Sequence, residues 1–409
     1  MSVSSAVSEK KAAEGLSGPK RHSPVFLAVF AVFLVTTAIC VAGTVIGVAA
    51  AHPSHHDTQW FWASGHLLVH GENPYDQHAI REIETSLGLQ IGDDLPMTRN
   101  PPTALFLMAP IGVLGPRAGV LAWAMLLVVC LAMSIWCIKS VQEQPNEHAL
   151  LWLAWCFAPA LLCIEMGQTG LIILLGLVLF LRFHSGRQFW AGVALSLCAV
   201  KPHLLLPFGV VLLAWIVVRR KWTALAGAVV ALAVEGLIAM ALDAHVWAHY
   251  YSAMRVQQIG EEAVPTLGVA LRFALDRTAM WIEFVPAALG CAWGLWYFAR
   301  NRKQWDWRTH GSLLTLVSLV VAPYSFFTDQ VIALPAILFV LLGAQKSRRG
   351  SLTLLLALMS AGTLEMMLLS LYSNIFIAQA IAWLAWYLYA MSGRAPGQKP
   401  LASAGLANA

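Results

Sequence analysis

Residues 222–242 read WTALAGAVVALAVEGLIAMAL and directly follow the basic triplet Arg219-Arg220-Lys221. Glu235 is the only ionisable residue in this stretch, and a helix of such length spans about 30 Å, the thickness of the hydrocarbon core of a bilayer. Apolar and polar residues do not alternate here, as they would in the strands of a membrane barrel. The stretch therefore predicts a membrane-spanning helix, and the triplet predicts that it begins in the cytoplasm.

Similar apolar stretches fill most of the 409-residue chain, which is 59% hydrophobic and only 11% charged. A soluble domain carries about a quarter charged residues, so lipid is the predicted surrounding. The other stretches are residues 24–51, 103–115, 117–138, 149–164, 170–183, 188–199, 203–218, 279–299, 310–322, 331–344, 351–371 and 375–391. Stretch 103–115 follows Pro101-Pro102 and is too short to cross alone. We predict an all-α polytopic membrane protein with about 12 transmembrane helices.

Basic residues mark one side of this topology. Of the 26 Lys and Arg residues, 18 lie in the two tails and in four short loops. The positive-inside rule places these segments in the cytoplasm, which explains the charge without a nucleic-acid partner. The predicted organisation is a disordered cytoplasmic tail (1–23), a single transmembrane domain (24–392) and a second cytoplasmic tail (393–409). Residues 52–102, with seven acids and two bases, form an extracytoplasmic loop.

The loop 52–102 has the pattern of two short interfacial helices. Asp57 stands where a helix N-cap would, ahead of the aromatic run Trp60-Phe61-Trp62, and Gly71 follows the apolar positions of this helix. Residues 80–87 then repeat apolar side chains at helical spacing. Helices with aromatic or apolar faces beside a membrane span are typical of segments that lie on the membrane surface.

Asp57 is the candidate for a general base. A carboxylate near a hydrophobic wall can have its pKa raised toward the range in which it works as a base. The alternative is that Asp57 only caps the helix. The adjacent His55 and His56 could add metal ligands, but neighbouring histidines in a loop rarely reach one ion. We expect neither a metal nor a cofactor.

Lys201 separates two apolar stretches, and it is followed by Pro202 and His203. An ionisable residue at this depth indicates function, and Lys201 and His203 could both face an anionic phosphate. The alternative is a lysine that snorkels to the interface. Gln168, in a turn with two glycines, offers a donor and an acceptor, or simply belongs to a tight interhelical turn.

Two arginines of the outer side, Arg99 and Arg272, could each hold a lipid phosphate or bind ordinary headgroups, and Arg272 is the preferred candidate. Glu235, Glu283 and Glu365 lie within apolar stretches and are expected to make interhelical hydrogen bonds. The sequence contains no Walker loop, Rossmann glycine fingerprint or serine-hydrolase elbow, so nucleotide and acyl-transfer chemistry have no local support.

Five groups of residues occur in an order that is shared with a known family. They are Asp57 with Trp60-Phe61-Trp62 and Gly71-Glu72-Asn73-Pro74-Tyr75-Asp76; Asn100-Pro101-Pro102 with Ala109-Pro110; Gly167-Gln168 with Val200-Lys201-Pro202; Pro265-Thr266-Leu267-Gly268 with Arg272; and Pro323-Tyr324-Ser325. Together they resemble glycosyltransferase family 87, membrane enzymes of the GT-C class, from about residue 24 to 345. In two places the chain departs from the family: Asn100 replaces a common aromatic residue, and Phe327-Thr328-Asp329 replaces a stretch that often carries Trp and His.

The resemblance implies a GT-C-like fold and an inverting transfer of a hexose, with mannose expected, from a polyprenyl-phosphate donor to a lipid or glycan hydroxyl. The reaction would take place at the outer face of a bacterial plasma membrane, among membrane lipids. Asp57 would be the catalytic base. The residues expected at the donor phosphate are Lys201, His203, Arg272 and Gln168, and those expected at the substrates are Trp60, Trp62, Tyr75 and Ser325.

Two other classes of protein would also explain the apolar chain and its buried charges. One is a transporter or flippase of lipid-linked sugars, although such a protein would favour internal symmetry over one large asymmetric loop. The other is a non-catalytic membrane scaffold whose outer loop binds lipids or a partner protein.

Overall fold

The computed structural model describes residues 56–87, 98–141, 153–256, 264–368 and 376–392, with positions 31, 35, 38 and 42. Within these ranges the chain forms α-helices and short 3-10 helices (η) and no strand, as the sequence predicts. The predicted stretch 24–51 lies outside the described residues apart from those four positions, and both predicted tails lie outside them entirely.

The helices follow one another with short connections. In chain order they are α3 His56–Val69, α4 Gln77–Ser86, η1 Pro102–Leu107, α5 Ala109–Gly112, α6 Pro116–Val141, α8 Ala158–Glu165, α9 Gly170–Phe183, α10 Gln188–Ser196, η2 Leu197–Val200, η3 Pro202–Leu205, α11 Leu206–Arg219, α12 Trp222–Leu242, α13 Val246–Val256, α14 Leu267–Leu275, η5 Met280–Phe284, α15 Val285–Asn301, η6 Arg302–Gln304, α16 His310–Val321, η7 Phe327–Ala333, α17 Leu334–Gly343, α18 Lys346–Leu368 and α19 Ile377–Ser392.

Five helical segments of the described residues are long and apolar enough to cross a membrane. They are Pro116–Val141, Pro202–Arg219, Trp222–Leu242, Met280–Gln304 and Ser347–Met367. Four more apolar helical segments are shorter: Gly170–Phe183, Gln188–Val200, His310–Val321 and Phe327–Gly343. The chain is therefore a helical membrane protein, and the number of 12 crossings stays a prediction.

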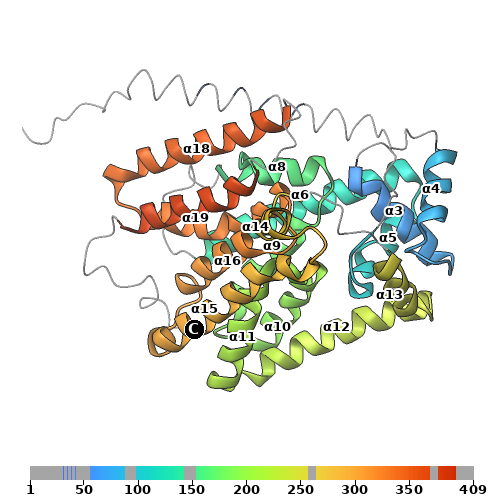
Figure 1. Cartoon of the computed structure of the whole chain (residues 1–409), viewed down its shortest axis with the longest axis horizontal. Helices are drawn as coiled ribbons and strands as arrows, with labels where there is room; N and C mark the ends of the chain where they lie inside the picture. Colours follow the sequence, from blue (N-terminus) through green and yellow to red (C-terminus); the bar gives the residue numbers. More distant parts are fainter. Residues whose placement is uncertain are drawn as a thin grey trace, which may run out of the picture.

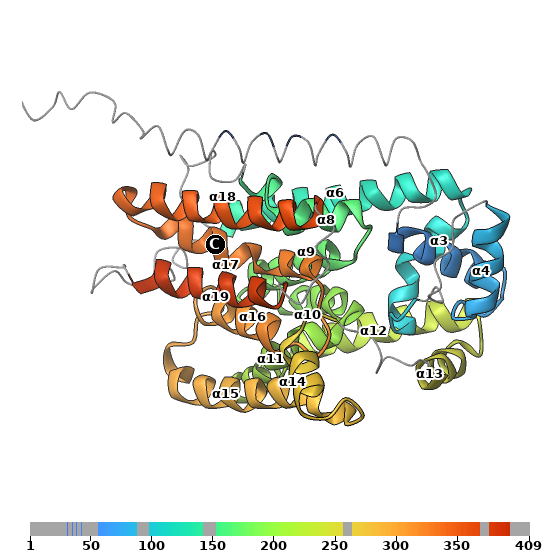
Figure 2. The same cartoon turned by 45° about the horizontal axis from the view of Figure 1, so that its top comes forward.

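The helices of the predicted outer loop, α3 and α4, lie at one end of the molecule together with α5 and α13. In Figures 1 and 2, α3, α4, α5 and α13 form a group there, and α12 runs from its junction with α11 toward this group. Stretch 103–115 forms the short helices η1 and α5 instead of one continuous helix. Met108 joins the two and is fully buried, so this segment packs inside the group.

Small residues bring α10 and α12 together. A Cβ atom added to Gly192 would overlap the Ala224 carbonyl oxygen, and one added to Gly227 would overlap the Phe189 carbonyl oxygen. Close backbone approach through small residues is the usual way in which helices associate in lipid. Ser196 donates a hydrogen bond to Glu235 Oε1 (2.6 Å) between the same two helices, which confirms the interhelical role expected for Glu235.

This packing predicts opposite effects for two glycine substitutions. Gly192→Ala would force α10 and α12 apart and lower stability by about 1–3 kcal/mol. The matched control is Gly209→Ala in α11, where an added Cβ meets nothing within 4 Å. It is expected to keep or raise stability, because alanine favours a helix by up to about 1 kcal/mol over glycine. Melting temperatures of the purified variants in detergent test this; equal melting temperatures would contradict the tight contact.

Candidate functional site

Asp57 lies in the first turn of α3, which begins at His56 among the described residues. Asp57 therefore lies inside the helix and not at an N-cap position, and an acid in the first turn interacts favourably with the positive end of the helix dipole. Its side chain is partly buried. Burial raises the pKa of Asp57 from 3.8 to about 6; the nearby positive charges of Lys201 and Arg99 lower it, and the negative charge of Asp329 raises it. Asp57 therefore lies within electrostatic reach of three segments that are distant in sequence.

The turn between α8 and α9 supports the start of α3. Gly167 has a φ of +69°, and a Cβ atom at this position would overlap the Thr58 hydroxyl. Trp123 of α6 donates its indole N–H to the Gly167 carbonyl (2.7 Å). Only glycine permits both this backbone conformation and this close approach. The contact places Thr58, and with it Asp57, against the turn that carries Gln168.

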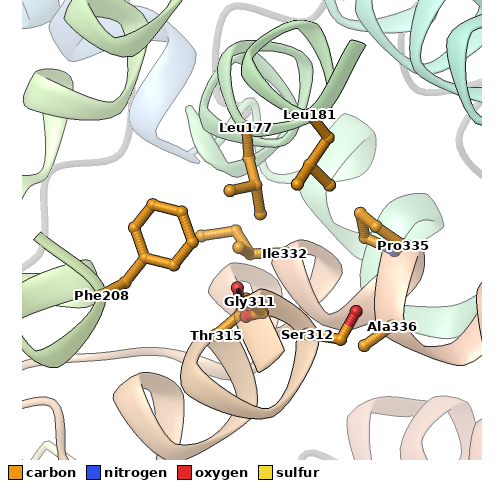
Figure 3. Close-up of a pocket in the computed structure, with 9 residues that line it drawn as sticks. All are labelled: Leu177, Leu181, Phe208, Gly311, Ser312, Thr315, Ile332, Pro335 and Ala336. Atoms are coloured by element: carbon orange, nitrogen blue, oxygen red, sulfur yellow. Dashed lines mark hydrogen bonds between the residues drawn. The ribbon is translucent and has the colours of Figure 1, made fainter. Parts of the chain in front are cut away.

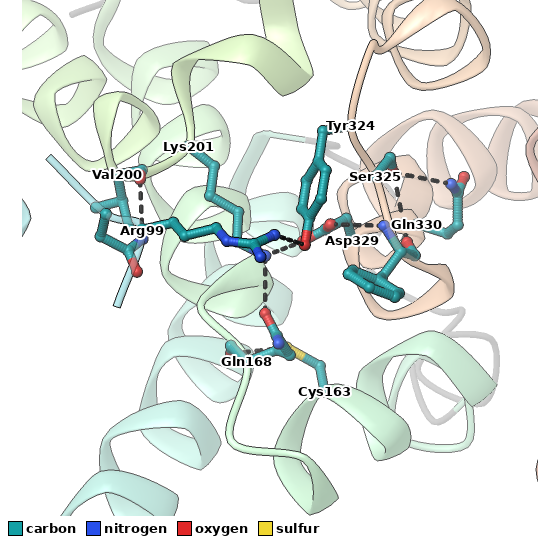
Figure 4. A network of polar contacts seen from close by, with 11 residues as sticks. Arg99, Cys163, Gln168, Val200, Lys201, Tyr324, Ser325, Asp329 and Gln330 are labelled. Atoms are coloured by element: carbon teal, nitrogen blue, oxygen red, sulfur yellow. Dashed lines mark hydrogen bonds and ion pairs between the residues drawn. The ribbon is translucent and has the colours of Figure 1, made fainter. Parts of the chain in front are cut away.

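Lys201 lies between η2 and η3, and its ammonium group joins two other segments. Nζ donates to Gln168 Oε1 (2.7 Å) and to Asp329 Oδ1 (2.8 Å). Figure 4 shows these side chains converging on one point. The Lys201 side chain is 11% exposed and that of Asp329 is fully buried. This geometry differs from that of a snorkelling lysine, whose ammonium group would face water.

Asp329 is held from its other side as well. Its Oδ2 atom accepts the backbone N–H of Phe326 (3.0 Å) at the start of η7. No role is predicted for Asp329 from the sequence, where it stands in a stretch that departs from the pattern of the family that the motifs resemble. The signal that could have revealed it is an acid at the beginning of an apolar stretch, where a charge is costly unless it has a partner.

Arg99 reaches the same place from the outer loop. Its Nη1 atom donates to the Tyr324 hydroxyl (3.0 Å), and its guanidinium carbon lies 5.6 Å from the centre of that ring. Next to it, Asn100 donates its side-chain N–H to the carbonyl of Val200 (3.0 Å), the residue before Lys201. The amide at position 100 thus ties the loop to the Lys201 segment, a contact that an aromatic residue would not make. We call Asp57, Arg99, Gln168, Lys201 and Asp329 the Lys201 network.

Residues 98–323 match the model of Glycosyltransferase family 87, and this range is more than half of the 409-residue chain. The chain belongs to glycosyltransferase family 87. Comparisons with curated proteins and with solved structures give no match. The match confirms the family that the motifs indicated and makes the chain a glycosyltransferase of the membrane. It includes Arg99, Gln168 and Lys201, whereas Asp57 and Asp329 lie outside the matched range.

Two further residues predicted for this family 87 site lie beside the network. His203 faces the Tyr324 ring edge-on, with ring centres 5.7 Å apart, and its Nε2 atom is buried without a hydrogen-bond partner among the described residues. Ser325 is buried, and its hydroxyl lies 3.5 Å from Gln330 Nε2. Both residues are therefore near the charged groups, and their predicted contacts with substrate stay predictions.

The predicted aromatic residues mainly pack inside the protein. Tyr75 is 2% exposed and donates its hydroxyl to the Asn100 carbonyl (2.9 Å). Trp62 is 5% exposed and donates its indole N–H to the Leu114 carbonyl (3.0 Å). Trp60 is partly buried and hydrogen-bonds Glu84. The geometry gives Tyr75 and Trp62 a structural role, because a sugar can stack only on a ring face that it can reach.

Arg272 does not join the Lys201 network. Its side chain is 1% exposed, pairs with Glu283 (Nε to Oε1, 2.6 Å) and donates from Nη1 to the Arg277 carbonyl (2.6 Å). The pair links α14 to η5, which agrees with the structural role expected for Glu283. To reach a donor phosphate, Arg272 would have to leave this buried pair, at a cost of several kcal/mol.

The part of the chain that the structure describes contains no group of three or more His, Cys, Asp and Glu residues that could hold a metal ion. The cavity in Figure 3 lies between α9, α11, α16 and the η7–α17 segment, and its lining is apolar apart from Ser312 and Thr315. Its volume of about 10 Å³ is enough for about one water molecule and far too small for a sugar. It is no candidate for the substrate site.

The contact between Gly167 and Thr58 predicts the effect of two glycine substitutions. Gly71→Ala places a side chain at a φ of +75°, where its Cβ atom would overlap nothing and lie 4.0 Å from the Leu242 carbonyl oxygen, so it should cost about 1–2 kcal/mol. Gly167→Ala adds the overlap with Thr58 and should lower the melting temperature further. Thr58→Ala in the Gly167→Ala background should recover part of the loss. Equal losses at both glycines, without recovery, would contradict the docking of α3 on this turn.

Proposed function

We propose that this family 87 enzyme transfers a hexose, with mannose preferred, from a polyprenyl-phosphate donor to a hydroxyl of a lipid or glycan acceptor. The transfer inverts the configuration of the sugar and takes place at the outer face of a bacterial plasma membrane. Family membership supports the transfer of a sugar, and the apolar helices support a donor and an acceptor that lie in the membrane.

The observation that carries this proposal is the environment of Asp57. Its raised pKa of about 6 is that of an effective general base: the carboxylate is ionised near neutral pH yet more basic than an ordinary aspartate. It also stands within electrostatic reach of two cationic side chains, Lys201 and Arg99. A base and a phosphate-binding group in one site are what this reaction requires.

The proposed reaction needs one base and one charged leaving group. The Asp57 carboxylate takes the proton of the acceptor hydroxyl, and the acceptor oxygen forms a bond to the anomeric carbon. On the opposite face the bond from this carbon to the phosphate oxygen breaks, and its electron pair leaves with the phosphate. The leaving phosphate is stable as an anion, so no general acid is needed. The protein has to stabilise the charge that develops on it.

Lys201 is the group best placed to stabilise this charge. A lysine has three N–H donors, and the described part of the chain supplies two acceptors, Gln168 and Asp329, which leaves one N–H for a ligand. Beside it, His203 has a buried ring nitrogen that has no hydrogen-bond partner among the described residues. We propose that Lys201, Gln168 and His203 bind the donor phosphate, and that Arg99 binds it as well. Arg272 belongs to this group only if it leaves Glu283.

In the proposed reaction the membrane brings the lipid-linked donor to the site. The predicted 12 crossings would place both tails and the basic loops in the cytoplasm, and α3, α4 and α13 at the outer surface. A polyprenyl chain is apolar and would approach between lipid-facing helices, so the donor phosphate would arrive at the level of the interface. Arg99 and Lys201 would then meet it there, as cationic side chains meet lipid headgroups.

Removal of the base tests the role of Asp57. Asp57→Asn keeps the size of the side chain but removes its basicity, and general-base catalysis is worth about 10²- to 10⁴-fold in rate. We expect a loss of this size without loss of folded protein. Membranes supplied with labelled polyprenyl-phosphate hexoses and analysed by mass spectrometry give the product and its amount.

The matched control is Glu72→Gln, the same chemical change at an exposed acid of the same loop. It should transfer sugar like the unaltered enzyme. Appreciable turnover by Asp57→Asn would overturn the assignment of the base. Translocation of lipid-linked sugar across reconstituted vesicles without any glycosidic product would overturn the transferase function and support a flippase.

The pKa of Asp57 predicts the pH dependence of the reaction. The carboxylate must be ionised to accept a proton, so kcat/KM should be constant above pH 7 and fall as the pH drops through about 6. Well below that value the fall should approach tenfold per pH unit. Measurement of the rate of transfer between pH 4.5 and 8 gives this fall of kcat/KM, the acidic limb of the pH profile. A fall of kcat/KM centred near pH 4, the range of an ordinary aspartate, would show that Asp57 does not act as a base with a raised pKa.

A further inference from the structure

The Lys201 network contains a second carboxylate that the transfer reaction does not use. Asp329 is fully buried, with one oxygen on the Lys201 ammonium group and the other on the Phe326 backbone N–H. The backbone contact fixes the carboxylate at the start of η7, so Asp329 cannot easily turn away from the lysine. Figure 4 shows this arrangement, in which Asp329 of η7 and Gln168 of the turn between α8 and α9 both reach Lys201.

The charges of the network balance in the absence of substrate. Lys201 and Arg99 carry one positive charge each, and Asp57 and Asp329 carry one negative charge each when ionised. The other three charges each act on Asp57, and Lys201 is also paired directly with Asp329. A phosphate that enters this site therefore meets a lysine whose charge is already compensated by a neighbouring carboxylate.

The proposed reaction raises the charge of the phosphate. A sugar phosphodiester carries one negative charge, whereas the phosphate monoester that leaves carries close to two near neutral pH. Opposite charges in a partly buried site attract strongly, because the effective dielectric constant is low. A lysine without a counter-ion would consequently hold the product more tightly than the donor and slow its release.

We propose that Asp329 is a positioning residue that acts as a fixed counter-ion of Lys201 and limits how tightly the site holds the phosphate of the product. Asp329 and Gln168 also orient the ammonium group so that its remaining N–H faces the ligand. This inference rests on the proposed function, since it concerns the release of a lipid phosphate from the same site.

The test uses Asp329→Asn, which removes the charge and keeps an oxygen for the Phe326 N–H. Farnesyl phosphate, a short isoprenoid phosphate monoester, serves as the probe in a binding measurement on the purified full-length protein in detergent. We expect its Kd to decrease by roughly tenfold, because an uncompensated ammonium group attracts the anion more strongly. In the transfer assay, kcat should fall while the KM for the donor falls or stays the same.

The matched control is Asp243→Asn, which removes a buried acid from another pair, with His249 Nδ1 at 2.7 Å from Asp243 Oδ2. It should leave the Kd of farnesyl phosphate unchanged. If Asp329→Asn gives little folded protein, Asp329→Ser, whose hydroxyl can also accept the Phe326 N–H, allows the same comparison. Asp329→Glu keeps the charge and should keep the affinity of the unaltered protein.

An unchanged or increased Kd in the folded Asp329 variants would overturn the counter-ion role and leave Asp329 as a structural residue. Substitution of a merely structural residue would lower kcat and the affinity for farnesyl phosphate together. Failure of the proposed function looks different, because the unaltered protein would then form no glycosidic product with any polyprenyl-phosphate hexose. The farnesyl phosphate measurement needs no turnover, so it tests the counter-ion role in either case.

Discussion

The contact of the Lys201 ammonium group with Gln168 and Asp329 holds the candidate site together. These residues come from three parts of the chain, and each is costly to bury without the others. A lysine in an apolar surrounding needs a counter-ion, a buried carboxylate needs donors, and the amide supplies one more acceptor. Because each group satisfies another, the protein can keep a cation in a largely buried position, which is where we propose that the donor phosphate binds.

The remaining structure brings the base to this cation. Gly167 lets α3 approach so closely that Thr58 lies on the turn before α9, and Asp57 follows from its place in the first turn. Asn100 ties the outer loop to the backbone at Val200. Two constraints on backbone position, one from a glycine and one from an amide, thus set the electrostatic environment in which the pKa of Asp57 rises to about 6.

The sequence predicts the helices well, because the hydropathy of a stretch and the basic residues that flank it depend only on neighbouring residues. Asp57, Lys201 and Gln168 were also predicted, the lysine because an isolated charge between apolar stretches is costly. Asp329 was missed, since its partner lies 128 positions earlier in the chain and no local pattern indicates the pairing. Arg272 shows the reverse case: arginine is a residue type that often binds phosphate, but the charge of this arginine is compensated by Glu283. The burial of aromatic rings such as Tyr75 depends on how separate helices pack, which residue type alone does not reveal.

The Asp57 carboxylate and the Lys201 ammonium group lie within electrostatic reach of each other and so share one site. The most direct measurement is the pH dependence of kcat/KM for Lys201→Gln, a substitution that removes the charge from position 201. Lys201 lowers the pKa of Asp57, so its removal should move the acidic limb of the profile to higher pH than in the unaltered enzyme. An acidic limb at the same pH in both proteins would show that the two groups do not interact and would contradict the shared site.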